Sequence, residues 1–338
     1  MNYLNCTIPF ATESGGTISD LKIAYSTYGK LNKEKNNVVW VCHALTSNSA
    51  VTEWWPGVVG ENCIIDPKKY FIVCANIIGS CYGTTGPTSV NAATGQPYFS
   101  NFPAVTIRDM VKAHIVLRQH LEIESIYLLM AGSMGGYQAL EWCVIESQRI
   151  QNLFLVTTSA AESAWGIAIH TSQRLAIEAD SSWRDEHLEA GKAGLKAARA
   201  IGLLTYRNYR ILVEKQTDTD PEKTDNFKAS SYINYQGDKL VKRFNAQSYW
   251  LLTKAMDSHN LARGRNKTQE QVLQSMPQRT LIMGITSDLL CPVEEQKHIA
   301  DNIPDATYIE IDSSYGHDGF LIECGKISKH LGDWLNKG

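Results

Sequence analysis

Apolar residues in this chain gather into short, almost continuous runs that predict strands buried on both faces of a sheet. Between the runs, residues 105–121 place Ile107, Met110 and Leu117 at helical spacing. Strand and helix therefore alternate, which is typical of a mostly parallel sheet covered by helices. The predicted strands lie at residues 36–45, 68–77, 125–131, 150–159, 279–286 and 306–312, and further helices at 134–145, 292–303 and 320–337.

Two regions depart from this alternation. Residues 4–10 and 18–29 predict two strands joined by the turn residues ESGG. From about Ala160 to Gln278 the sequence is rich in helix formers. We expect helices there at 168–179, 186–204 and 246–258, with a charged loop at 214–231. The chain is thus predicted to form a discontinuous core of residues 1–160 plus 277–338, interrupted by a helical lid of residues 161–276.

Composition excludes several classes of protein. With 338 residues, 43% hydrophobic and 20% charged, the chain is an ordinary globular protein. A formal net charge of -3 gives no basic footprint for nucleic acid or for a membrane surface. The beginning of the chain lacks a signal-peptide pattern, and no apolar run is long enough to span a bilayer. Eight scattered cysteines without a C-x-x-C pair predict reduced thiols, no metal site and a cytoplasmic location.

The stretch LMAGSMGGYQ at residues 129–138 sets Ser133 among glycines between a predicted strand and a predicted helix. This is the context of the G-x-S-x-G nucleophile turn, which lifts a serine above the carboxyl edge of a sheet. Ala131 stands where that pattern has its first glycine. Taken alone, the stretch could equally be a close turn between a strand and a helix.

The order of two further residues favours the nucleophile. Asp288 follows the predicted strand at 279–286, and His317 lies in the loop after the strand at 306–312. Serine, then acid, then histidine is the chain order of the α/β-hydrolase triad. His317 would take the proton of Ser133, and Asp288 would fix the imidazole tautomer.

Acyl transfer also requires donors for the developing oxyanion. The backbone N–H of Met134 follows the nucleophile directly, and the second donor should come from the loop CHALTSNS at 42–49. His43 in that loop ends an apolar strand, and we expect a structural role for it. The glycine-rich GSCYGTTGP at 79–87 lacks the lysine of a P-loop and is expected to be a shaped loop near the site.

Eight segments, in order along nearly the whole chain, resemble the homoserine O-acetyltransferase family of α/β-hydrolase-fold acyltransferases. They are HALT (43–46), NIIGSCYGTTGPTS (76–89), VTIRDMV (105–111), GSMGGYQALEW (132–142), SAWGIA (163–168), SHNLARGR (258–265), TSDLLCPVEEQ (286–296) and GHDGFL (316–321). The resemblance implies Ser133, Asp288 and His317 as the triad, and the Leu45 and Met134 amides as oxyanion donors. It further implies that Arg199 and Asp318 bind the amino-acid substrate, with Tyr206 as a weaker candidate.

The resemblance also implies a ping-pong reaction, in which acetyl-CoA acylates the serine and L-homoserine receives the acetyl group on the way to methionine. Acetyl-CoA is then a cosubstrate, no permanently bound cofactor is expected, and the lid is expected to build a homodimer interface. Departures from the family pattern near the pocket, such as Ala131, leave open a succinyl donor or a serine acceptor. A serine esterase and a catalytically silent binding protein are the alternatives from other classes.

Overall fold

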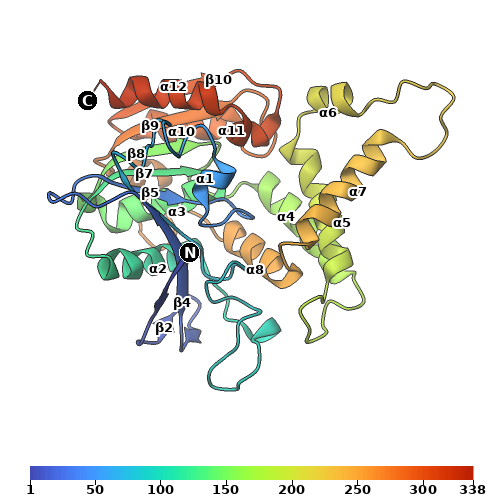
Figure 1. Cartoon of the computed structure of the whole chain (residues 1–338), viewed down its shortest axis with the longest axis horizontal. Coiled ribbons are helices and arrows are strands. Elements are labelled where there is room, and N and C mark those ends of the chain that lie inside the picture. Colours follow the sequence, from blue (N-terminus) through green and yellow to red (C-terminus); the bar gives the residue numbers. More distant parts are fainter. Residues whose placement is uncertain (338) are drawn as a thin grey trace.

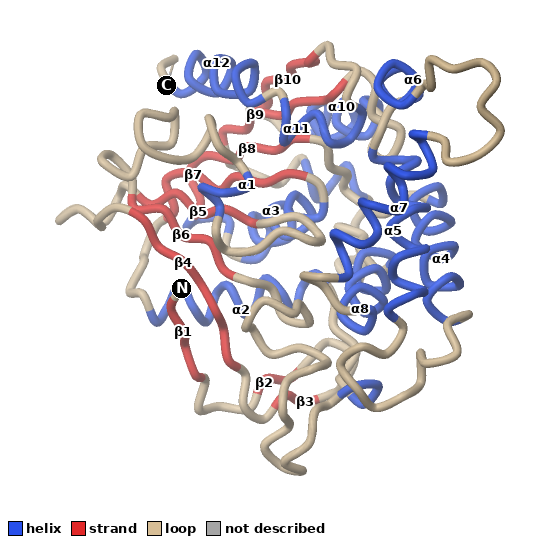
Figure 2. Tube along the Cα trace, turned by 45° about the vertical axis from the view of Figure 1, so that its right-hand side comes forward, coloured by secondary structure: helices blue, strands red, loops and turns tan. Residues whose placement is uncertain are grey.

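The computed structural model describes residues 1–337, and a central sheet of eight strands organises this part of the chain (Figures 1 and 2). The strands from β6 to β10 run parallel, while β4 pairs antiparallel with both β1 and β6. A mostly parallel α/β sheet is therefore confirmed. The order across the sheet is β1 (Asn2–Asn5), β4 (Lys22–Tyr28), β6 (Phe71–Ala75), β5 (Val38–Cys42), β7 (Ile126–Gly132), β8 (Ile150–Val156), β9 (Arg279–Ile285), β10 (Ala306–Ile311).

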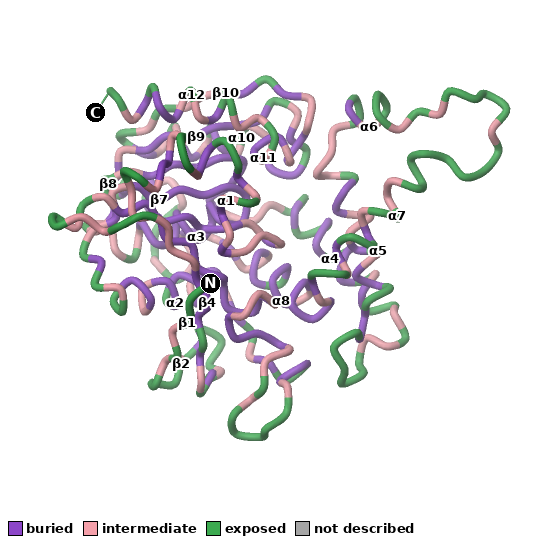
Figure 3. The backbone as a smooth tube through the Cα atoms, in the orientation of Figure 1, coloured by how far each residue is buried: buried purple, intermediate pink, exposed green. Residues whose placement is uncertain are grey.

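Helices cover both faces of this sheet, which explains why its strands read as unbroken apolar runs. In β5, Trp40 and Cys42 belong to one apolar cluster while Val39 and Val41 belong to the other, because successive side chains point to opposite faces. The central strands are accordingly coloured as buried over most of their length (Figure 3). One cluster packs under α2 (Ile107–His120), α3 (Met134–Ile145) and α10 (Val293–Asn302), and the other under α1 (Val51–Trp54), α11 (Gly319–Ile322) and α12 (Cys324–Leu335).

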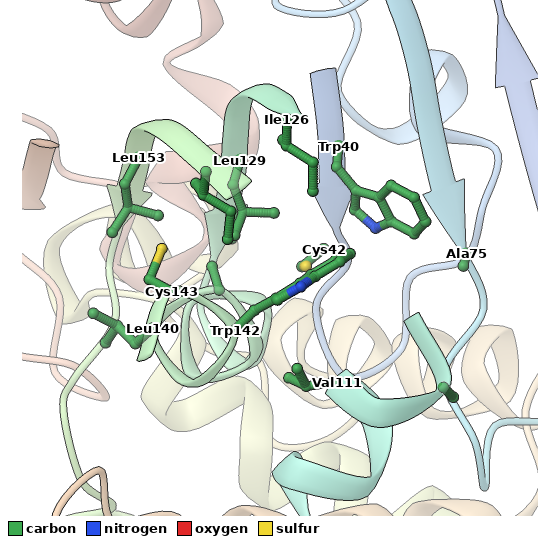
Figure 4. Packing of buried hydrophobic residues seen from close by; sticks show 14 of the residues in the cluster. Trp40, Cys42, Ala75, Val111, Ile126, Leu129, Leu140, Trp142, Cys143 and Leu153 are labelled. Atoms are coloured by element: carbon green, nitrogen blue, oxygen red, sulfur yellow. The ribbon is translucent and has the colours of Figure 1, made fainter. Parts of the chain in front are cut away.

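Trp40 and Trp142 are two large, fully buried members of the first of these clusters (Figure 4). Their rings meet edge to face with centroids 4.9 Å apart, and His114 of α2 stacks on Trp142 at 5.6 Å. Burial lowers the pKa of His114 to about 4, so its ring is neutral at physiological pH. Its Nε2 lies 2.9 Å from Oε1 of Gln138, a bond that holds α2 against α3.

A helical insertion separates β8 from β9 and projects from the sheet, on the right in Figure 1. Its two connections to the core run side by side: the Leu261 amide donates to the Ala160 carbonyl, and the Glu162 amide donates to the His259 carbonyl, both at 2.9 Å. We call this pairing the neck. No helix within residues 1–337 is long and apolar enough to cross a bilayer. The inserted helices are α4 (Ala164–Glu178), α5 (Lys192–Tyr206), α6 (Tyr209–Gln216), α7 (Lys228–Val241) and α8 (Ala246–Asp257), followed by the short α9 (Gln269–Leu273).

Several predicted boundaries were wrong. The strand expected at 4–10 is divided between β1 and a small hairpin of β2 (Phe10–Ala11) and β3 (Thr17–Ile18). The helix expected from residue 186 begins only at Lys192, because Gly191 has a left-handed φ of 72° that no helix contains. The charged loop is shorter than 214–231, since α6 ends at Gln216 and α7 begins at Lys228.

The final helix, expected to be continuous over 320–337, is broken into α11 and α12 at Glu323. A continuous helix would need the Phe320 carbonyl as an acceptor for the amide four residues later. The indole Nε1 of Trp55 instead donates to that carbonyl at 2.9 Å. A contact from Trp55, the residue that follows α1, is thus made at the point where the helix breaks.

Candidate active site

Ser133 occupies a sharp turn between the end of β7 and the start of α3. Its backbone has φ 56° and ψ -132°, a conformation that costs a non-glycine residue roughly 1–3 kcal/mol. Neighbouring strands hold the turn in place: the Ser133 amide donates to the Val156 carbonyl at 3.1 Å, and the Thr158 hydroxyl donates to the Ser133 carbonyl at 2.9 Å. The strained turn is thus fixed by β8 and the residues that follow it.

The glycines after Ser133 make room for this turn. A Cβ added at Gly135 would lie 2.2 Å from the carbonyl oxygen of Cys42, and one added at Gly136 would lie 2.2 Å from the Thr158 hydroxyl. Helix α3 therefore approaches β5 and the end of β8 more closely than any side chain permits. Ala131, by contrast, is buried in the sheet core without such a constraint.

A Gly135→Ala variant is expected to lose about 1–3 kcal/mol in the free energy of unfolding, because α3 must move away from the Cys42 carbonyl. Urea denaturation followed by circular dichroism measures this loss. Gly325→Ala is the matched control, since a Cβ at that helical position meets nothing within 4 Å and should be neutral or stabilising. Equal stability of the two variants would contradict the close approach.

His317 and Asp288 lie beside Ser133 in space. Along the chain, His317 is 184 residues from Ser133 and 29 residues from Asp288. Nε2 of His317 is 2.8 Å from Oγ of Ser133, and Nδ1 of His317 is 2.7 Å from Oδ2 of Asp288. The other oxygen of Asp288 accepts the amides of Leu290 and Cys291 at 2.8 and 2.9 Å. All three side chains are buried. Serine, imidazole and carboxylate thus form one hydrogen-bonded line, an arrangement that can activate a hydroxyl as a nucleophile.

Burial alone would lower the pKa of His317, but the charge and hydrogen bond of Asp288 outweigh it, and Asp318 and Glu162 add to the effect. The pKa of His317 is therefore raised above its ordinary 6.5. A general base must be unprotonated, so kcat/KM is expected to fall with decreasing pH around a midpoint above 6.5. Asp318→Asn should move this midpoint to lower pH, whereas Asp312→Asn, an exposed carboxylate outside the line, should not. An unmoved midpoint in both variants would contradict the assignment.

The loop after β5 brings Leu45 to the site, and α3 brings Met134. Gln138 ties the two segments together, because its Nε2 donates to the carbonyls of both His43 and Met134 at 3.2 and 3.3 Å. The Ile77 amide donates to Nε2 of His43, and Nδ1 of His43 donates to the Ala44 carbonyl. Burial lowers the pKa of His43 to about 4, so the ring is neutral at physiological pH. Its role is structural, because its two hydrogen bonds hold the loop in place. The side chains of Leu45 and Met134 lie in one buried apolar cluster, and Met134 directly follows Ser133.

The predicted substrate residues gather around His317. The ring of Tyr206 lies with its centroid 5.9 Å from that of His317, and the guanidinium carbon of Arg199 lies 5.3 Å from the centroid of Tyr206. Among residues 1–337, no group bonds the buried Nε of Arg199. Asp318 follows His317 directly. Tyr206 therefore lies near both the His317 ring and the Arg199 guanidinium, and Asp318 adjoins His317 in the chain.

Sequence reasoning missed two groups near this site. Arg207 pairs with Asp318, with its Nε 3.3 Å from Oδ2 of Asp318. The sequence feature that could have indicated Arg207 is its position directly after Tyr206. The buried carboxylate of Glu162 accepts a hydrogen bond from the hydroxyl of Tyr137 at 3.0 Å, and burial raises the pKa of Glu162. No local pattern marks this second pair, because it forms only when the neck meets α3.

Asp288, Cys291 and His317 place ligand-type atoms within 4.8 Å of one another, a spacing that could suggest a metal site. Both oxygens of Asp288 already accept hydrogen bonds. Burial raises the pKa of the Cys291 thiol well above its ordinary 9.0, so it is not a ready thiolate ligand. The chemistry of these groups fits a proton relay better than a metal site.

Solved structures share this architecture. Homoserine O-acetyltransferase from Bacillus anthracis is similar with a TM-score of 0.91 at 24% identity, covering 99% of this chain and 97% of that one. Esterase E22 is similar with a TM-score of 0.90 at 22% identity, covering 99% of each chain. Transferases and esterases thus share the fold, and the fold alone does not separate transfer from hydrolysis.

Sequence relatives narrow the family. A model of the alpha/beta hydrolase fold matches residues 37–323. The homoserine O-acetyltransferase of Cyclobacterium marinum is 46% identical over 95% of this chain and 91% of its own length. That of Trichormus variabilis is 43% identical over 97% of this chain and 91% of its own length. An acyltransferase or hydrolase chemistry follows, and the chain belongs to the homoserine O-acetyltransferase family of α/β-hydrolase-fold enzymes.

Proposed function

We propose that this family member moves the acetyl group of acetyl-CoA to the hydroxyl of L-homoserine, through an acetyl-enzyme on Ser133, in methionine biosynthesis. The observation that carries the proposal is the hydrogen-bonded line from Ser133 through His317 to Asp288. The names of the sequence relatives supply the homoserine acceptor and the acetyl group, and the family resemblance supplies acetyl-CoA as the donor. Acetyl-CoA is consumed as a cosubstrate, and the proposal includes no permanently bound cofactor.

In the first half of the reaction, Oγ of Ser133 attacks the thioester carbonyl while Nε2 of His317 takes the hydroxyl proton. Asp288 keeps the proton of His317 on Nδ1 and stabilises the imidazolium. The amides of Leu45 and Met134 are proposed to donate to the oxyanion of the tetrahedral species. Its collapse breaks the carbon–sulfur bond, and CoA leaves as the thiol with the proton from His317.

In the second half, homoserine occupies the place that CoA has left. Arg199 is proposed to bind its carboxylate, because this arginine has no carboxylate partner in the part of the chain described. Asp318, held by Arg207, is proposed to bind its ammonium group, and the Tyr206 ring to line the pocket. His317 then removes the proton of the side-chain hydroxyl, the acetyl group moves to that oxygen, and Ser133 recovers its proton.

The insertion of residues 161–276 is proposed to act as a lid that limits access of water to the acetyl-enzyme. Its helices also carry large exposed apolar side chains, which favour burial against a second copy of the chain. We therefore propose a homodimer, which light scattering coupled to size exclusion tests. The eight free thiols favour the cytoplasm, a reducing compartment. The exposed side chains are Trp165, Ile167 and Leu175 on α4, Leu204 on α5, Tyr209 and Val213 on α6, and Tyr235 on α7.

The activity is tested by incubating the protein with acetyl-CoA and following free thiol with and without L-homoserine. Homoserine should accelerate thiol release, and O-acetylhomoserine should be detected by mass spectrometry. Succinyl-CoA and L-serine, offered in competition, identify the preferred donor and acceptor from the product masses. Thiol release that homoserine does not accelerate, with no acetylated product, would instead indicate an esterase.

A further inference from the structure

Two neighbouring hollows lie on the rim between the insertion and the core, outside the group of residues around Ser133. The aromatic hollow, of about 140 Å³, is lined by Phe99, Phe102, Trp183, Gln247 and Trp250 among others. The basic hollow, of about 280 Å³, is lined by Lys192, Lys242 and Arg243 among others. They are neighbours because the loop before α5 and the first residues of α8 contribute to both.

The aromatic hollow has the features of a site for a flat heterocycle. Trp183 and Trp250 lie with ring centroids 6.1 Å apart and planes tilted by 37°. Gln247 is only 9% exposed, and within residues 1–337 its Oε1 has no hydrogen-bond partner. An unpartnered buried acceptor costs free energy unless a ligand donates to it. A ring bearing an amino group would supply both the stacking surface and the donor.

The basic hollow has the features of a phosphate site. Its one lining carboxylate, Glu189, is already paired with Lys192. Lys242 and Arg243 have no carboxylate partner in the described chain, so their charges are uncompensated. The first residues of two helices, α5 and α8, also line the hollow, but their amides already have partners: the Gly194 amide donates to Oδ2 of Asp180 at 2.9 Å, and the Ser248 amide donates to Oδ1 of Asn245 at 2.7 Å. The uncompensated cations are therefore the feature that points to phosphate groups.

Two connections link the hollows to the reacting groups. Arg243 donates to the Thr46 carbonyl at 2.5 Å and to the Tyr82 hydroxyl at 2.6 Å, and Thr46 directly follows Leu45. Helix α5 runs from Lys192 at the basic hollow to Tyr206 beside His317, a length of roughly 20 Å at 1.5 Å per residue. A pantetheine arm has about the reach of four to five extended residues, roughly 15 Å. The arm is thus about 5 Å shorter than the helix, so the phosphates must lie on the Tyr206 side of Lys192 for the acetyl group to reach the site.

We propose that the two hollows bind the nucleotide end of acetyl-CoA, with the adenine ring in the aromatic hollow and the phosphates in the basic hollow. This assignment rests on the proposed function, because it assumes that acetyl-CoA is the donor and that its pantetheine arm carries the acetyl group from the phosphates to Ser133. Gln247 would accept a hydrogen bond from the adenine amino group. Lys242 and Arg243 would pair with phosphate oxygens.

The unmodified protein provides the first test. Acetyl-CoA is compared with S-acetylpantetheine, which has the same arm and acetyl group but no nucleotide, using L-homoserine as acceptor. The kcat/KM for acetyl-CoA should exceed that for the short donor by at least about tenfold. Equal values would overturn the proposal. If neither donor yields O-acetylhomoserine, the proposed function itself has failed, which is a different outcome.

Two substitutions then locate the nucleotide. Lys242→Gln and Gln247→Leu should each lower kcat/KM for acetyl-CoA by about fivefold and leave the value for S-acetylpantetheine unchanged. Gln247→Leu removes a buried amide oxygen that has no hydrogen-bond partner within residues 1–337, so loss of the fold is not expected. Lys239→Gln is the matched control, since Lys239 is an exposed lysine of α7 that does not line either hollow. Equal losses with both donors, or no loss with either, would contradict the assignment.

Adenosine 3′,5′-bisphosphate distinguishes a substrate subsite from a separate regulatory site. The proposal expects competitive inhibition against acetyl-CoA, little inhibition with S-acetylpantetheine, and weaker inhibition of the Lys242→Gln variant. Equal inhibition with both donors would indicate a nucleotide effector instead and would overturn the proposal. No inhibition at any accessible concentration would overturn it as well.

Discussion

A Ser133→Ala variant is expected to form O-acetylhomoserine about 10⁴–10⁶ times more slowly than the unmodified protein. The substitution removes the only atom at position 133 that can carry the acetyl group, while the glycines and the bonds that hold the turn remain. Product formation is measured by mass spectrometry, and circular dichroism reports whether the fold is retained. When homoserine is withheld, an acetyl adduct should be found on the unmodified protein and not on the variant.

Ser159→Ala is a suitable control, because Ser159 is a buried serine after the neighbouring strand β8 whose hydroxyl bonds Tyr137 at 3.3 Å. Its rate should remain within a few-fold of the unmodified protein. A Ser133→Ala variant that matched the unmodified protein in every turnover assay would remove the nucleophile from the proposal. It would also restore the hypothesis of a silent binding protein on a hydrolase fold.

An Asp288→Asn variant is expected to lose about 10⁴-fold in kcat with little change in fold. Oδ1 of Asp288 accepts two backbone amides, so the asparagine oxygen should keep that place and its NH₂ group should face Nδ1 of His317. The ring must then carry its proton on Nε2, where it cannot accept the proton of Ser133. Steady-state kinetics with saturating homoserine measure the loss.

The control for this variant is Asp301→Asn, which removes an exposed carboxylate from α10 and should leave kcat unchanged. Thermal unfolding of both variants separates loss of catalysis from loss of structure. An Asp288→Asn enzyme within tenfold of the unmodified rate would show that the imidazole does not depend on this carboxylate for its tautomer.

The strands of the sheet and the residues of the candidate triad could be predicted because both leave local patterns. A strand buried on two faces, such as β5 with Val39 and Trp40, reads as a continuous apolar run. A serine turn with small neighbours is visible because Gly135 and Gly136 leave no room for side chains. Because Asp288 and His317 each follow a predicted strand, as Ser133 does, their loops were expected at the same edge of a mostly parallel sheet.

Features that depend on distant contacts could not be predicted. The break at Glu323 coincides with a contact in which the Trp55 indole donates to the Phe320 carbonyl, 265 residues away along the chain. The pairing of Arg207 with Asp318 depends on the packing of the end of α5 against the loop that carries His317, which no local pattern indicates. The two hollows are likewise invisible in the sequence, because their residues come from segments that are far apart.

The neck between Ala160 and Leu261 has a consequence for how such enzymes can diverge. Since the two connections of the insertion leave the core side by side, its roughly one hundred residues form a closed loop and do not set the spacing of β8 and β9. Doubling the length of a flexible loop costs only about 0.6 kcal/mol in closure entropy. Loops beyond the neck, such as the one between α6 and α7, can therefore change length with little effect on the spacing of β8 and β9, whereas the helices that share a buried cluster with Met110 and Tyr137 cannot be lost as easily. Access to the serine can thus evolve through these loops, separately from the sheet that positions it.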